Sequence, residues 1–324
     1  MSKPFKVLVI GGAGFIGQAV CNQLARAGAQ ITVPTRRLAH AKHLLTLPTC
    51  RVVQANIHDR AALGRLVAGQ DAVVNLLGVL HSRRGKPYGQ EFRTNHVEFP
   101  KALTTSMIQH RVKRLVHISA LGVGVQNPAP SMYLRSKTDG EAIVKDSGLA
   151  WTILRPSVVF GPDDRFLNLF AGLTKLFPVI PLAGANTRFQ PVSVSDVAAA
   201  VVSSLTDKNR DTVHNTYDLA GPDVLTLKEL VAMCGKAVGA SPWIVGLPVP
   251  AAKAQAFLME LAPGAPLMSR DNVDSMRIDN VRTAGQLFPL AHYDSVRVSA
   301  PPYLAARFGP SELDQYRNRR QSTD

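Results

Sequence analysis

The stretch that decides the fold is Lys6-Val-Leu-Val-Ile-Gly11-Gly-Ala-Gly14-Phe-Ile-Gly17. Its unbroken run of β-branched and aliphatic residues predicts a strand buried on both faces, as in a parallel sheet. Glycines end the run, and the apolar residues that follow them recur with helical spacing. Another apolar run, Gln30-Ile-Thr-Val-Pro34, comes after this helix. The sequence therefore predicts a strand, a glycine-rich turn, a helix and a second strand.

Each glycine of this motif has a physical task. One permits the tight turn, one lets a pyrophosphate approach the backbone, and one lets the helix pack closely on the strand. Free N–H groups and the partial positive charge at the helix start then hold the diphosphate. An ordinary structural turn is the alternative, because glycine clusters are common in turns. The position between a strand and a helix favours a dinucleotide site.

The end of the second strand indicates which dinucleotide binds. An NAD site usually has Asp or Glu there, about 20 residues past the glycines, to accept hydrogen bonds from the ribose 2′-OH. This chain has Thr35-Arg36-Arg37 instead. A guanidinium donates to a phosphate and cannot accept from a hydroxyl, which predicts NADP(H) as the cofactor. Arg36 is the main candidate and Arg37 the second; two arginines that only solubilise a loop are the alternative.

The bulk properties predict a globular protein. At 324 residues the chain exceeds the usual single core, so we expect a large α/β domain with a smaller lobe. Cys21, Cys50 and Cys234 have no paired spacing, which predicts a reducing compartment with neither a disulfide nor a metal site. We expect no secretory signal and no transmembrane segment, and therefore a cytoplasmic protein.

The net charge of +14 predicts anionic partners. Basic clusters occur at 36–37, 81–86, 110–114 and 317–320. They are scattered and lack interleaved aromatic residues, which argues against a nucleic-acid surface. We expect an anionic membrane surface or an acidic protein subunit as the partner. A solvated basic surface without a partner is the alternative.

Strands and helices alternate from the first glycine motif to Pro156. This predicts an α/β fold of the Rossmann type, a doubly wound parallel sheet with its ligand across the carboxyl ends of the strands. We assign 1–160 to the NADP(H)-binding domain, which strands and helices of 188–238 rejoin. The remainder of 161–324 is expected to form a smaller, proline-rich lobe and tail.

The fifth strand is followed by a helix that carries Tyr133-Leu-Arg-Ser-Lys137. Positions i and i+4 share a helix face, so the lysine ammonium is expected near the phenol and to lower its pKa. Such a phenol can pass a proton to a carbonyl while NADPH delivers hydride. A chance Tyr-x-x-x-Lys is the alternative, and the position after a dinucleotide motif argues against it.

The glycine motif together with Tyr133 and Lys137 resembles the short-chain dehydrogenase/reductase superfamily, in its extended or atypical branch. The segments 118–122, 133–141, 154–168 and 189–197 are similar to the NADPH-binding accessory subunit family of respiratory complex I and its bacterial relatives. This resemblance covers roughly residues 5–235. The last ninety residues match only loosely.

The resemblance implies a cofactor site built from the strand ends. It assigns the pyrophosphate to Gly11, Ala13, Gly14, Phe15 and Ile16, and the 2′-phosphate to Arg36. It assigns the adenine to Asn56 and Ile57, and the adenosine and phosphate side to Leu76, Leu77 and Gly78. It assigns the nicotinamide ribose to Ile118, Ser119 and Lys137, and the nicotinamide to Pro156 and Ser157.

One departure bears on catalysis. Extended members carry a Ser-Ser pair after the fifth strand, and its second position aligns with Ala120 here. Without that hydroxyl the proton-transfer chain is incomplete, with Ser119 or Ser131 as substitutes. The resemblance thus implies a cofactor held for structure, assembly or a quinone-related function, on the inner face of a membrane. The alternatives are an active reductase or epimerase that uses Tyr133, Lys137 and Ser119, and a regulatory dinucleotide sensor.

The C-terminal half carries weaker signals. We expect helices at 165–176, 226–238, 251–261 and 269–278, a further helix capped by Ser195-Asp196, a strand at 212–219 and an irregular tail. Gln190, Ser193 and Asp196 are candidates for lining a substrate cleft. The apolar stripe Ala251, Ala254, Phe257, Leu258 and Leu261 predicts either core packing or a helix offered to a membrane surface or a quinone-bearing partner.

Overall fold

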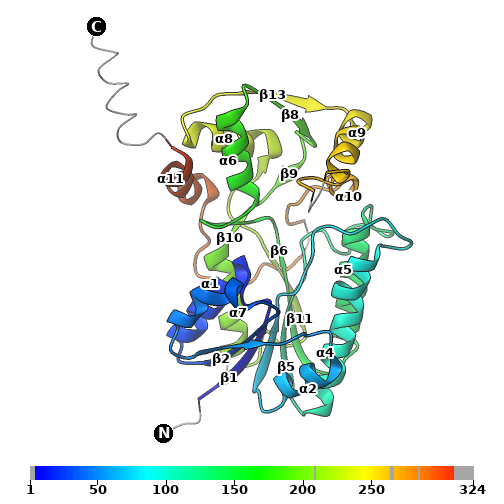
Figure 1. Ribbon diagram of the computed structural model, residues 1–324, viewed down its shortest axis with the longest axis vertical. Coiled ribbons are helices and arrows are strands. Elements are labelled where there is room, and N and C mark those ends of the chain that lie inside the picture. Colours follow the sequence, from blue (N-terminus) through cyan, green and yellow to red (C-terminus); the bar gives the residue numbers. More distant parts are fainter. Residues whose placement is uncertain (1–3, 208, 263–265, 284, 310–324) are drawn as a thin grey trace.

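The computed structural model describes residues 4–207, 209–262, 266–283 and 285–309 (Figure 1). Its central sheet has seven parallel strands in the order β11-β6-β5-β4-β1-β2-β3. Their bounds are β1 (Lys6–Ile10), β2 (Gln30–Thr35), β3 (Cys50–Gln54), β4 (Ala72–Asn75), β5 (Arg114–Ile118), β6 (Ala150–Pro156) and β11 (Asn215–Leu219). This order confirms the doubly wound, Rossmann-type prediction.

Helices cover both faces of the sheet (Figure 1). One face carries α1 (Phe15–Arg26), η1 (Leu38–Thr46) and α7 (Val194–Thr206). The other carries α2 (Arg60–Val67), α4 (Phe99–Gln109) and α5 (Met132–Lys145). Val7 and Val9 of β1 point into the first core, whereas Leu8 and Ile10 point into the second. Both faces of β1 are therefore buried, which explains its uninterrupted apolar run.

Side-chain caps begin α2, α5, α7, α8 (Leu227–Ala237) and α10 (Arg270–Ser275). Asp59 caps α2, since its Oδ1 accepts the Ala62 N–H at 2.7 Å. Residues 90–109 form three consecutive helical elements, α3 (Gln90–Phe92), the π-helical η2 (Arg93–Glu98) and α4. The predicted Ser195-Asp196 cap is wrong, because Ser193 caps α7 and its Oγ accepts the Ser195 N–H at 3.2 Å.

A second lobe stands over the carboxyl ends of the strands (Figure 1). Its strands are β7 (Val159–Phe160), β8 (Val179–Ala183), β9 (Arg188–Phe189), β10 (Val192–Ser193), β12 (Leu225–Thr226) and β13 (Trp243–Leu247). Its helices are α6 (Phe166–Leu176), α8 (Leu227–Ala237), α9 (Val249–Glu260), α10 (Arg270–Ser275) and α11 (Val296–Phe308). Of the segments expected to rejoin the sheet domain, α7 and β11 do so, but α8 packs in the core of this lobe.

Strand β13 and helix α11 were not expected from the sequence. The tail expected to be irregular contains α11, in which Pro301 and Pro302 lie inside the helix. Proline lacks an N–H and disfavours helix interiors. Packing overrides this preference, because Val296, Ala300 and Leu304 recur every four residues and are completely buried.

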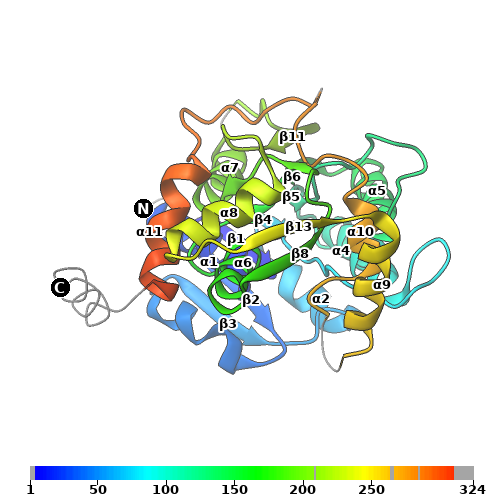
Figure 2. The same cartoon turned by 90° about the horizontal axis from the view of Figure 1, so that it is seen from above.

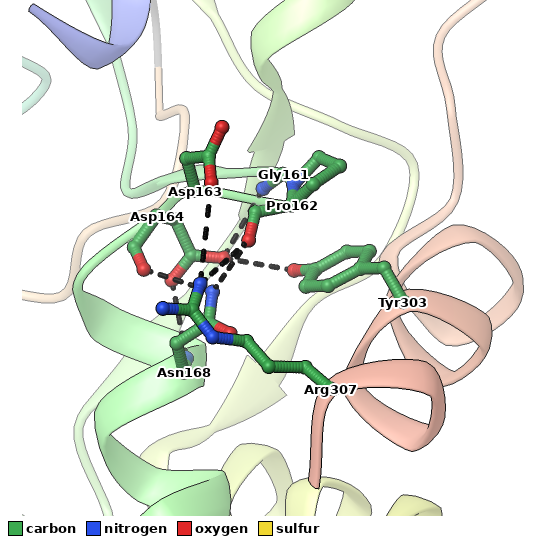
Figure 3. Close-up of polar contacts among 7 residues, drawn as sticks. All are labelled: Gly161, Pro162, Asp163, Asp164, Asn168, Tyr303 and Arg307. Carbon is green, nitrogen blue, oxygen red and sulfur yellow. Dashed lines mark hydrogen bonds and ion pairs between the residues drawn. The ribbon is translucent and has the colours of Figure 1, made fainter.

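Asp164 joins α6 to α11 (Figure 3). Its carboxylate accepts the Leu167 N–H at 2.6 Å, the Gly161 N–H at 3.2 Å and the Tyr303 hydroxyl at 2.8 Å. Arg307 donates to the Pro162 carbonyl from the same helix α11, at 3.3 Å. The end of the 154–168 segment thus forms a structural joint within the second lobe.

Two further features concern the described part of the chain. No helix there combines the length and the apolar character needed to cross a bilayer. No group of three or more His, Cys, Asp or Glu side chains gathers there as a metal site would require. The basic cluster at 317–320 lies outside the described residues.

Candidate functional site

The glycine turn between β1 and α1 has the geometry that its sequence predicts. Gly11 has a φ of +81°, a conformation that side chains with a Cβ rarely adopt. A Cβ on Gly17 would lie 2.5 Å from the Cα of Gly12 and also meet the Gly11 carbonyl. Gly11 therefore makes the turn, and Gly17 lets α1 pack directly on the end of β1.

The start of α1 is an open anion-binding end. Gly14 is the N-cap residue, no side chain caps the helix, and its first turn has no acidic residue. The N–H groups that begin the helix, at Phe15 and Ile16, point out of this end with the positive end of the helix dipole. Ala13, in the turn itself, packs against the core beneath α1. This arrangement suits a diphosphate.

Arg36 and Arg37 lie just past the end of β2 and are both exposed. No ion pair among the described residues involves either of them. Arg36 lies near the end of β3, where Gln54 Nε2 donates to its carbonyl at 3.4 Å. Burial and the charge of Arg36 lower the pKa of His58 in the turn after that strand. In that turn the Asn56 Oδ1 accepts the His58 N–H at 3.1 Å. Ile57 packs against the core beside it.

The segment after β4 connects the glycine turn to α5. The Leu76 N–H donates to the Ile10 carbonyl at 2.9 Å, and the Leu77 N–H donates to Asn75 Oδ1 at 3.1 Å. A Cβ on Gly78 would lie 3.4 Å from the Nζ of Lys137. The residues from Leu76 to Gly78 thus run from the glycine turn toward the lysine.

Lys137 is buried in the middle of the site. Its Nζ donates to the Ile118 carbonyl at the end of β5, at 3.2 Å. Burial lowers the pKa of Lys137 to about 8, and the nearby Glu141 carboxylate opposes that fall. Glu141 itself is 2% exposed and makes two hydrogen bonds to the Arg155 guanidinium, at 2.7 and 2.6 Å. This ion pair ties α5 to β6 one turn after the lysine.

The environment of Tyr133 differs from the expected one. Burial raises the pKa of the Tyr133 phenol to about 12, whereas the sequence analysis expected Lys137 to lower it. The ring packs edge-on against His96 and Phe92, with centroids 5.6 and 5.9 Å away. The lysine ammonium instead faces the Ile118 carbonyl, so burial dominates the pKa of the phenol.

The hydroxyl groups expected beside the phenol are differently placed. Ser131 caps α5, since its Oγ accepts the Leu134 N–H at 3.2 Å. The Ser119 hydroxyl is buried and has no hydrogen-bond partner among the described residues. Ala120 packs in an apolar cluster with Leu134 and Ile278.

Hydrogen bonds with the loop after β5 and with Asn280 hold the end of β6 at Pro156 and Ser157. The Pro156 carbonyl accepts the Leu121 N–H at 2.9 Å, and the Ser157 hydroxyl donates to Asn280 Oδ1 at 2.6 Å. Asn280 Oδ1 also accepts the Val158 N–H at 3.0 Å. No local pattern marks Asn280 in the sequence, because its partners lie more than a hundred residues away.

The side chains of the three residues proposed for a substrate cleft make hydrogen bonds to backbone groups. Gln190 donates to the Gly221 carbonyl and accepts the Arg282 N–H, at 2.8 and 3.0 Å. Ser193 caps α7, and the Asp196 carboxylate accepts the Asp294 N–H at 2.9 Å. The capping explanation offered for Asp196 is therefore wrong, because Ser193 is the N-cap residue of α7.

Two residues of the site, Asp271 and His96, were not expected from the sequence. The Asp271 carboxylate, from α10, accepts the N–H groups of Met132 and Tyr133 at 2.7 and 3.0 Å and so fastens the second lobe to the start of α5. His96 lies in η2, where its Nε2 accepts the Val79 N–H at 3.1 Å. Burial, with the charge of Lys137, lowers the pKa of His96 to about 2 and keeps the ring neutral. Neither contact has a local sequence signal.

These elements fit a dinucleotide along the carboxyl ends of β1, β2, β4 and β5. The open start of α1 would hold the diphosphate, and Lys137 would face the nicotinamide half. When bound, a reduced nicotinamide supplies hydride. Burial raises the pKa of the Tyr133 phenol to about 12, and position 120 carries no hydroxyl.

Comparisons with known proteins agree with this geometry. A family model described as NAD(P)H-binding matches residues 11–208. The chain is 31% identical over 287 residues to the mitochondrial NADH dehydrogenase (ubiquinone) 1 alpha subcomplex subunit 9 of Arabidopsis thaliana, covering 84% of this chain and 70% of that protein. The Mus musculus subunit is 30% identical, with 84% and 72% covered.

A solved structure supports the fold. The NADPH-dependent quinone oxidoreductase QOR2 of Escherichia coli, complexed with NADPH, superposes with a TM-score of 0.73 over 92% of this chain and 99% of that one, at 19% identity. Since a family model matches more than half of the chain and relatives at 30% identity or more cover most of it, the chain belongs to the NAD(P)H-binding family that includes subunit 9 of mitochondrial NADH dehydrogenase (ubiquinone).

Proposed function

We propose that the protein holds NADP(H) chiefly as a structural cofactor and acts as an accessory or assembly protein of a respiratory-chain complex. The observation that carries this proposal is the combination of an intact dinucleotide cradle with a raised Tyr133 pKa and no serine at position 120. A tightly bound cofactor favours the folded state by linkage, by about 2.7 kcal/mol at a hundredfold excess over Kd.

The choice of NADP(H) over NAD(H) rests on Arg36. Its exposed guanidinium, without an acidic neighbour among the ion pairs of the described residues, suits a 2′-phosphate. The site roles proposed for Gly11, Gly14, Asn56, Ser119 and the other strand-end residues follow from the same placement of the cofactor.

Replacing Arg36 with alanine is expected to weaken NADPH binding by about tenfold to a hundredfold, since a hydrogen bond to a charged group contributes about 1.5–3 kcal/mol. NADH binding should not change, because that nucleotide has no 2′-phosphate. Titration calorimetry of both nucleotides measures the difference, and Lys42→Ala, another exposed cation of this domain, is the control. A wild-type protein that prefers NADH would contradict the choice of cofactor.

Replacing Tyr133 with phenylalanine is expected to leave bound NADPH and thermal stability unchanged, because the described residues give its hydroxyl no hydrogen bond. The nucleotide released on denaturation should be identified as NADP(H) by mass spectrometry. The wild type should not oxidise NADPH with a panel of quinones, ketones and nucleotide sugars. Rapid turnover that Tyr133→Phe abolishes would instead establish an active reductase or epimerase.

The proposed setting is the cytoplasmic side of a membrane, with the protein peripheral to its inner face. The two relatives described above carry names of respiratory-chain subunits, and the net charge of +14 favours acidic protein or lipid partners. Copurification with respiratory-complex subunits would support this placement.

A further inference from the structure

Helix α9 turns its apolar stripe toward solvent. Ala251, Ala254, Phe257, Leu258 and Leu261 are all exposed, and Leu258 and Leu261 are each 67% exposed. The buried residues of α9 are the two alanines between them, Ala252 and Ala256. Core packing, one of the two explanations for this stripe, is therefore wrong. Several large aliphatic side chains exposed on one helix mark an interaction surface.

A second group of exposed apolar side chains belongs to the β8–β13 pair and the end of α6. Trp243 is 78% exposed and Leu176 is 72% exposed, with Phe177, Val179 and Val245 exposed beside them. The Trp243 N–H donates to the Pro178 carbonyl at 2.8 Å, which brings the two segments together. Figure 2 looks onto the end of the molecule where β8, β13 and α9 lie together. We call these residues and the α9 stripe the apolar end.

The acidic side chains near the apolar end are either paired with cations or buried. Glu260 pairs with Arg270 at 2.7 Å, and Asp274 pairs with Lys253 at 2.8 Å. Asp271 is buried against the start of α5. The carboxylates of α9 and α10 are thus neutralised or covered.

Cations without such partners lie next to α9. Arg84 and Lys86 are exposed in the loop after β4, and no ion pair among the described residues involves them. The Arg135 Nε of α5 donates to the Pro87 carbonyl of this loop at 3.1 Å, and Asp271 of α10 accepts the Met132 and Tyr133 N–H groups at the start of the same helix. Since ion pairs join α10 to α9, the loop lies on the α9 side of the second lobe (Figure 2), and the apolar end has a basic rim.

We propose that the apolar end docks on an anionic phospholipid surface. Leu258 and Leu261 would enter the boundary between headgroups and acyl chains, and Trp243 would sit at headgroup level, where tryptophan is enriched. Arg84 and Lys86 would meet lipid phosphates. An apolar protein surface or a second copy of this basic chain would leave those cations without anions. The inference rests on the proposed placement beside a membrane and is independent of the cofactor site.

Flotation with phosphatidylcholine vesicles, with and without phosphatidylglycerol, tests the proposal. The wild type is expected to float only with the anionic vesicles and to be released by salt. The double variant Leu258→Glu, Leu261→Glu should bind about tenfold more weakly or worse, because inserted leucines supply the apolar term. The double variant Arg84→Glu, Lys86→Glu should lose a similar factor through the electrostatic term.

Matched variants on the sheet domain serve as controls. Leu45→Glu changes a leucine that is 66% exposed on η1, and Lys42→Glu with Lys113→Glu makes the same charge change. Both should float like the wild type, and every variant should keep its NADPH affinity as a check of folding. Failure of the wild type to float, or equal flotation of all variants, would overturn the proposal. The proposal would also be overturned if the wild type did not bind lipid and formed a dimer in light scattering. The double variant Leu258→Glu, Leu261→Glu would then be monomeric.

Discussion

Replacing Glu141 with alanine is expected to lower the free energy of unfolding by about 3–5 kcal/mol, the usual loss when one partner of a buried ion pair is removed. The substitution would leave the Arg155 guanidinium, which makes both of its bonds at 2.6 and 2.7 Å to this carboxylate, without its anion between α5 and β6. Urea denaturation measures the change. Because Lys137 lies one turn away, NADPH affinity should fall as well.

Two controls separate the buried pair from its exposed neighbour. Lys145 also pairs with Glu141 but its side chain is 38% exposed, so Lys145→Ala should cost less than about 1 kcal/mol. The double variant Glu141→Leu, Arg155→Met should recover much of the loss, since buried ion pairs are often replaceable by apolar residues. A Glu141→Ala protein as stable as the wild type would contradict the role of this pair.

The pair also predicts a pH dependence. Burial opposes ionisation of Glu141, but hydrogen bonds and the charge of Arg155 hold its pKa below the usual range. A carboxyl with a lowered pKa in the folded state stabilises the protein above its unfolded-state pKa. This contribution is lost as the pH falls through the folded-state pKa. The stability difference between wild type and Glu141→Gln should therefore be largest near neutrality and shrink in acid.

Replacing Gly17 with alanine is expected to lower the free energy of unfolding by about 3 kcal/mol and to abolish tight NADPH binding. The new Cβ would lie 2.5 Å from the Gly12 Cα and 2.7 Å from its carbonyl carbon. Backbone atoms of the turn cannot rotate away as a side chain can, so α1 must move off β1. That movement would misplace the N–H groups at the helix start.

Gly172→Ala is the matched control, because it is the same change inside α6 with the nearest atom outside the helix, Phe308 Cε1, 3.7 Å from the new Cβ. It should be neutral or stabilising by up to about 1 kcal/mol. Calorimetric melting together with NADPH titration measures both variants. Equal effects of the two substitutions would show that the close contact at Gly17 matters neither for stability nor for NADPH binding.

Features that depend on neighbouring residues were predictable from the sequence, whereas features that depend on distant contacts were not. The glycine turn, the alternation of strands and helices and the Asp59 cap of α2 were predictable, because each depends on residues a few positions apart. The π-helical stretch around His96 and the packing of α8 in the second lobe were not. They depend on which distant segments cover a helix, and that information is not in the local spacing.

The sequence by itself determined the doubly wound sheet, the dinucleotide cradle and the positions of Tyr133 and Lys137 on a common helix. Glycine geometry and apolar periodicity are local properties, and they leave few other folds. Only the tertiary structure decided the burial and the neighbours of those residues. The aromatic packing around Tyr133, the Asp271 contact across 138 residues and the outward stripe of α9 all arise from non-local burial, which sets pKa values and exposure.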